Sequence, residues 1–158
     1  MLRLHNAVPV PAFRLDHPVA SRIFQFAASI SLNDTERTCV DYAMLLVDKA
    51  LVAEGMQDIQ MHPAVYFTAD GTLSLSFCGE QYMGMYQPII ILPVQRWRDM
   101  GYGPLHIIVC VLEEFCHCLW RILDENIVKD KVVQLVQQDM PSLTRQALYE
   151  GFECPSQQ

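Results

Sequence analysis

The segment from about Leu105 to Leu123 is the strongest constraint on what this chain can fold into. Only five of its residues are firmly polar, namely His106, Glu113, Glu114, His117 and Arg121. A helix this apolar has to be covered on nearly every side, so it is predicted to lie at the centre of the domain. Its polar residues are spaced so that one face carries a stripe of His106, Cys110, Glu113 and His117. Because buried carboxylates are costly unless they are paired or bound, this stripe is where we expect a site.

A second helix is predicted over residues 34–54. Asn33 is suited to the N-cap, and Glu36, three residues later, completes a capping box. Apolar residues recur at helical spacing along this segment, and Gly55 is a favourable residue for the position after the last turn.

The middle of the chain changes to the alternating period of strands. Residues 63–69 and 72–78 flank Asp70-Gly71, which is a favoured turn pair, and they predict a β-hairpin. Residues 88–94 are apolar on both faces and bounded by prolines, which predicts a third strand. The Met/Tyr-rich segment 79–87 is predicted to connect these strands, or to form an irregular strand itself.

The ends of the chain complete the predicted organisation. Asp124 is expected to cap a helix over 125–138, and Pro141 to open a short helix that ends near 151. Residues 1–30 are predicted to form an extended arm packed on the domain, anchored by Phe13, Ile23, Phe24 and Phe26. We therefore expect one α+β domain over 31–152, with a sheet of three to four strands, followed by a tail over 153–158.

Composition excludes several functional classes. The chain has 11 Lys and Arg against 18 Asp and Glu, giving a net charge of −7, and no basic run. Nucleic acid and anionic membranes both require clustered positive charge, so neither is an expected partner. The six cysteines include no Cys-x-x-Cys pair, and residues 1–13 lack the apolar core of a signal peptide. These features predict a soluble cytoplasmic protein with reduced thiols.

The central helix resembles a known family. Residues 107–120 read Ile-Ile-Val-Cys-Val-Leu-Glu-Glu-Phe-Cys-His-Cys-Leu-Trp, with an apolar run leading into Glu-Glu-x-x-His. This segment is similar to the active-site helix of zincin metallopeptidases of the minimal gluzincin type, whose motif is His-Glu-x-x-His. The order of helix, small sheet, motif helix and later helices over 34–138 is also similar. One of the three defining residues differs, because Glu113 stands where the family has its first histidine.

The resemblance implies a zinc-dependent hydrolase or peptidase and assigns roles to individual residues. His117 and Glu113 match the two metal ligands that one helical face supplies, and Glu114 matches the general base. Asp124 and Glu125 are candidates for the third ligand that the family takes from a later helix. A carboxylate at position 113 is compatible with Zn²⁺, suits Mn²⁺ as the alternative metal, or leaves a degenerate site that binds neither.

Other interpretations remain open at this point. Glu113 and His117 equally suit a buried hydrogen-bonded pair, and Asp124 and Glu125 suit helix capping and the first helical turn. The functional alternatives are a zincin-fold binding or regulatory domain without catalysis, and an unrelated α+β module. A peptide or protein is the expected substrate or partner, bound along a sheet edge or at the Met/Tyr segment over 82–86.

Overall fold

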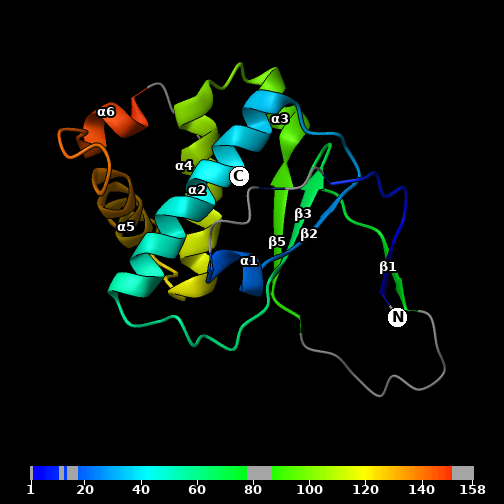
Figure 1. Cartoon of the computed structure of the whole chain (residues 1–158). Helices are drawn as coiled ribbons and strands as arrows, with labels where there is room; N and C mark the ends of the chain where they lie inside the picture. Colours follow the sequence, from blue (N-terminus) through cyan, green and yellow to red (C-terminus); the bar gives the residue numbers. More distant parts are fainter. Residues whose placement is uncertain (1, 11–12, 14–17, 78–86, 151–158) are drawn as a thin grey trace.

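The structure is a computed structural model of the 158-residue chain, and it describes residues 2–10, 13, 18–77 and 87–150. Within these residues the fold is a mixture of helices and strands (Figure 1). The elements in chain order are β1 (Leu2–Leu4), α1 (Ala20–Ile23), β2 (Gln25–Ala28), α2 (Asp34–Ala53), β3 (Ala64–Thr68), β4 (Leu75–Phe77), β5 (Ile89–Pro93), α3 (Val94–Asp99), α4 (Pro104–Leu119), α5 (Glu125–Gln137) and α6 (Arg145–Tyr149). The predicted α+β class is therefore confirmed.

The main sheet has the order β2-β3-β5, and its described strands all run parallel. Helix α2 connects β2 to β3, as parallel neighbours require a crossover of this kind. Each of the five residues of β3 is buried, because this strand lies between two neighbours and is covered on both faces. Strand β5 matches the third strand expected from residues 88–94.

The predicted β-hairpin around Asp70-Gly71 is wrong. Both edges of β3 are already paired with parallel strands, so β4 cannot pair with it and instead runs antiparallel to β1. The turn itself is real, because Gly71 has φ +85° and Asp70 Oδ1 accepts a hydrogen bond from the Thr72 N–H at 3.0 Å. The turn pair therefore redirects the chain to a different sheet.

The N-terminal segment was predicted to be an extended arm packed on the domain. In the structure it also contains helix α1 and strand β2, which is an outer strand of the main sheet. Asp48 of α2 fixes the start of α1, because the Asp48 carboxylate accepts hydrogen bonds from the N–H groups of Val19 and Ala20 at 2.7 and 2.8 Å. The expected anchors Phe13, Ile23 and Phe24 are buried, and Phe26 is half-buried.

The predicted helices occur, with differences at two of their ends. The capping box of Asn33 and Glu36 is confirmed in α2, and Asp124 caps α5. Helix α4 ends at Leu119 and not at Leu123, because Arg121 has φ +54°, which ends the helical path. Pro141 does not open the last helix, which begins after Thr144 with the Thr144 hydroxyl as its cap.

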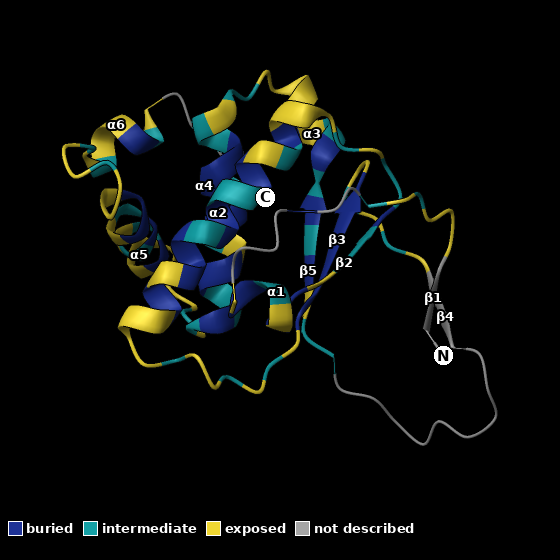
Figure 2. Ribbon diagram, in the orientation of Figure 1, coloured by how far each residue is buried: buried dark blue, intermediate teal, exposed yellow. Residues whose placement is uncertain are grey.

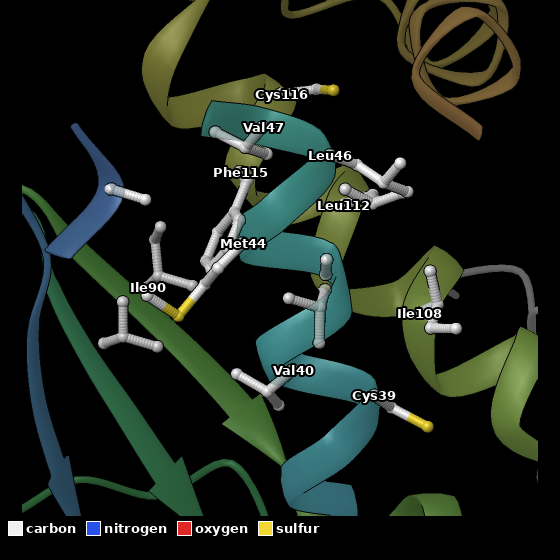
Figure 3. Close-up of a cluster of buried hydrophobic side chains, with 14 of the residues drawn as sticks. Cys39, Val40, Met44, Leu46, Val47, Ile90, Ile108, Leu112, Phe115 and Cys116 are labelled. Carbon is white, nitrogen blue, oxygen red and sulfur yellow. The ribbon is translucent and has the colours of Figure 1, made fainter. Parts of the chain in front are cut away.

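The helices α2, α4 and α5 lie to one side of the main sheet (Figure 1). Buried residues line the surfaces where these helices and the sheet meet (Figure 2). Figure 3 shows Met44 of α2, Phe115 of α4 and Ile90 of β5 within this core. The apolar face of the central helix is thus covered as its sequence predicts, and its C-terminal turns reach the edge of the core near the start of β5. Among the described residues, no helix is both long and apolar enough to cross a membrane.

Candidate functional site

A cleft of about 530 Å³ lies where the last turns of α4 meet the start of β5. On the α4 side, the cleft is lined by Glu114, His117, Cys118 and Arg121. The first three lie on one face of the helix because His117 and Cys118 follow Glu114 by three and four residues, and Arg121 lies just beyond the helix end. The remaining lining is apolar and consists of Met61, Pro88, Ile89, Ile90 and Leu123. Polar groups that converge in an apolar cleft are typical of a ligand-binding site.

The imidazole of His117 is oriented by the backbone that follows its own helix. Its Nδ1 lies 2.6 Å from the carbonyl oxygen of Ile122, so Nδ1 carries the proton and donates it to this acceptor. The other ring nitrogen, Nε2, is then the one available to groups in or beside the cleft. A histidine held in this way through a backbone carbonyl is typical of metal-ligating and proton-transferring histidines.

Glu125 is the acidic residue that contacts Nε2 of His117. Its Oε1 atom lies 3.5 Å from His117 Nε2. Two ligands that share a tetrahedral zinc with bonds of about 2.0–2.2 Å are separated by about 3.3–3.5 Å, so the observed spacing suits a shared ion. Glu125 belongs to the first turn of α5, and the Asp124 cap fixes where that turn begins.

Glu114 lines the same cleft. Its side chain is exposed there, yet burial of its carboxyl group among protein atoms raises its pKa, and the nearby Glu125 adds to this effect. The adjacent His117 acts in the opposite direction. A carboxyl group whose pKa is raised is better suited to take up and return a proton than one with its ordinary pKa.

Glu113 is placed away from the cleft. The hydroxyl of Tyr149 in α6 donates a hydrogen bond to Glu113 Oε1 at 3.0 Å. Burial raises the pKa of Glu113, although the Tyr149 hydrogen bond and the charge of Lys129 oppose this effect. Lys129 also stands over the Tyr149 ring, 5.4 Å from its centre, so Glu113 belongs to a contact between α4, α5 and α6.

Asp124 serves the backbone of α5. Its Oδ1 atom accepts hydrogen bonds from the N–H groups of Asn126 and Ile127 at 2.8 and 3.1 Å. These two bonds satisfy N–H groups that have no partner within the helix, which is the role expected of an N-cap. Of the two candidates for a third metal ligand, Glu125 therefore approaches His117 and Asp124 does not.

The metal implied by the sequence can be tested against these positions. His117 and Glu125 suit two ligands of one ion, and Glu114 is a further carboxylate in the same cleft. Across the part of the chain that the structure describes, no group of three or more His, Cys, Asp or Glu side chains is gathered for a metal. Among the described residues, the cleft therefore offers two candidate ligands, His117 and Glu125, and no third.

The sequence did not single out the apolar wall of the cleft or Arg121. Met61 and Pro88 come from loops far from α4 in sequence, and their placement depends on the parallel sheet. Met61 contacts α4 directly, since the Cys118 thiol lies 3.6 Å from its sulfur. Burial also raises the pKa of Cys118, which disfavours a reactive thiolate. The Met/Tyr segment over 82–86 lies outside the described residues.

Comparison of the chain with known protein families, with curated proteins and with solved structures found no match. The assignment of function therefore depends on the residues of the cleft.

Proposed function

We propose that the chain is a zincin-like, metal-dependent hydrolase that acts on peptides in the cytoplasm, with its site in the cleft at the end of α4. The observation that carries the proposal is the orientation of His117. Its Nδ1–H is directed to Ile122, which leaves Nε2 3.5 Å from Glu125 Oε1. This arrangement supports His117 and Glu125 as ligands of one Zn²⁺ or Mn²⁺ ion.

His117, Glu125 and Glu114 would then have separate roles. His117 and Glu125 would hold the ion, and Glu114 would receive the proton of the attacking water. An ion held there would polarise the substrate carbonyl as a Lewis acid. The water oxygen bonds to the carbonyl carbon, the C–N bond breaks, and Glu114 returns the proton to the leaving nitrogen. With two protein ligands, His117 and Glu125, we expect weaker zinc binding than a site with three ligands would provide.

The sheet supports a peptide as the substrate. Strand β5 is an outer strand of the described sheet, and its first residue, Ile89, lines the cleft. The Ala64 N–H bonds to the Pro88 carbonyl, and the alternation of the ladder turns the N–H and C=O groups of Ile89 and Ile91 away from β3. An extended peptide paired with this edge would reach the cleft.

A binding domain without catalysis is the second candidate. It is favoured by the contact between Glu113 and Tyr149, because the first position of the motif then supports packing of α6. In this case the cleft binds a ligand without cleaving it.

Hydrolysis of an unstructured protein such as casein, in the presence of added Zn²⁺ or Mn²⁺, separates the two candidates. We expect cleavage by the native chain, loss of cleavage in Glu114→Gln, and retention in Glu113→Gln. The two variants make the same chemical change at adjacent positions, so they form a matched pair. Absence of cleavage by a folded, metal-loaded protein would favour the binding domain.

A further inference from the structure

A second cavity, of about 570 Å³, adjoins the first and shares Met61, Pro88 and Arg121 with it. It lies between the segment that follows α2 and the end of α4. Its other lining residues are Met56, Ile59, Gln60, His62, Gln87 and Leu119. The proposed chemistry does not use this cavity, so its own composition has to indicate what it binds.

The second cavity combines one fixed positive charge with an apolar wall. Among its described lining residues, Arg121 is the one Lys or Arg, and none is Asp or Glu. Arg121 is exposed, and within the described part of the chain it makes no hydrogen bond or ion pair. Met56, Ile59 and Leu119 supply the apolar surface beside it. A ligand that fits this lining carries an anionic group next to an apolar one.

The first cleft differs from the second in its acidic groups. Glu114 lines the first cleft and Glu125 lies beside His117, whereas no Asp or Glu is among the described lining residues of the second cavity. Arg121 borders both cavities, and a guanidinium group binds a carboxylate through two parallel hydrogen bonds. The anionic end of a bound chain therefore fits the second cavity, where no acidic side chain among the described lining residues opposes it.

We propose that the second cavity binds the C-terminal residue of a peptide, with its carboxylate on Arg121 and an apolar side chain against Met56, Ile59 and Leu119. This inference rests on the proposed function, whose substrate it narrows to peptides cut near their C-terminus. The preceding residues of the peptide extend from the second cavity towards His117.

Binding of N-acetyl-leucine and of its neutral analogue N-acetyl-leucinamide, measured by titration with NMR detection, tests this inference. Hydrogen bonds to charged groups contribute enough that we expect the acid to bind about tenfold or more tightly than the amide. Arg121→Gln should remove this preference, and Arg121→Lys should keep part of it. Arg96→Gln, an exposed arginine outside both cavities, is the matched control and should retain the full preference.

Equal binding of acid and amide, or an unchanged preference in folded Arg121→Gln, overturns the inference. Tighter binding of octanoate than of N-acetyl-leucine overturns the assignment to peptides and indicates a fatty acid. The His117→Ala variant separates this inference from the proposed function, because it should lose metal and hydrolysis while it keeps the acid preference. An acid preference in a native chain that neither binds metal nor cleaves casein contradicts the proposed function alone.

Discussion

The His117 ring and the Ile122 carbonyl oxygen are 2.6 Å apart, and this contact closes the end of α4 onto the segment that leads into α5. It depends on Arg121, whose φ of +54° turns the chain back towards the helix. A left-handed conformation at a residue other than glycine costs about 1 kcal/mol, so the surrounding contacts have to hold it. The orientation of His117 and the backbone conformation at Arg121 are therefore parts of one arrangement.

Two substitutions of His117 separate its structural role from its proposed chemical role. Asparagine places an amide nitrogen near the position of Nδ1, so His117→Asn can keep the hydrogen bond to Ile122. Glutamine reaches the position of Nε2 and loses that bond. We expect urea unfolding to show His117→Gln to be less stable than His117→Asn by about 0.5–1.5 kcal/mol. Equal stabilities would contradict the role of Ile122 as the acceptor.

The raised pKa of Glu113 leads us to expect a specific dependence of folding stability on pH. Its pKa is raised mainly by burial, so the folded state favours the neutral form. The contribution of this group to stability is complete below its unfolded pKa and is lost as the pH rises through its folded pKa. Because Gln stays neutral, Glu113→Gln should gain stability relative to the native chain between pH 4 and pH 7. Urea unfolding at both pH values measures this difference.

Asp139 is the control of opposite sign. Its pKa is lowered mainly by the hydrogen bond from Lys49, so its stabilising contribution is present above its unfolded pKa and is lost as the pH falls through its folded pKa. Asp139→Asn should therefore lose stability relative to the native chain as the pH rises from about 2 to about 5, the range that spans the lowered folded pKa and the unfolded pKa. Changes of the same sign in both variants would show that the two carboxyl groups are misassigned.

The ion pair between Glu36 and Arg98 joins α2 to α3. Glu36 is 2% exposed, and Arg98 donates to its two carboxylate oxygens at 2.6 and 2.8 Å. Removal of Arg98 leaves a buried charge without its main partner, so Arg98→Ala should lower the free energy of unfolding by about 2–4 kcal/mol. Arg96→Ala, on the exposed face of the same helix, should change it by less than about 0.5 kcal/mol. Similar losses in both variants would contradict a specific pair.

Substitution of Phe115 and of Leu123 by alanine tests where the buried part of the central helix ends. The Phe115 ring is fully buried and stacks on Phe24 with 4.4 Å between ring centres, whereas Leu123 is 90% exposed. We expect Phe115→Ala to cost about 3–5 kcal/mol of stability and Leu123→Ala to change it by less than about 0.5 kcal/mol. A large loss in Leu123→Ala would indicate that the helix continues to residue 123. Thermal and urea unfolding both measure these differences.

Sequence reasoning succeeded where local chemistry decides the structure. The capping box of Asn33 and Glu36 and the cap at Asp124 depend on side chains within three residues of their partners, so both were predictable. The central position of α4 followed from its apolar composition. The pairing of β3 was not predictable in this way, because Asp70-Gly71 specifies a turn and does not specify which strand lies across it.

The candidate site was predictable in part for the same reason. The helical spacing of Glu114 and His117 placed them close together, and both line the cleft. The direction of Glu113 depends on Tyr149, which lies 36 residues away in sequence, and no local pattern reveals that contact. The end of α4 depends on a left-handed arginine, which is an uncommon residue for that conformation.

Zinc binding by the purified 158-residue chain tests the central claim most directly, with titration calorimetry for affinity and elemental mass spectrometry for stoichiometry. We expect one Zn²⁺ per chain, lost in His117→Ala and in Glu125→Gln and retained in Glu113→Gln, whose side chain faces Tyr149. A folded native chain that binds no zinc at millimolar concentration, or a Glu113→Gln variant that loses its zinc, would contradict His117 and Glu125 as the metal ligands.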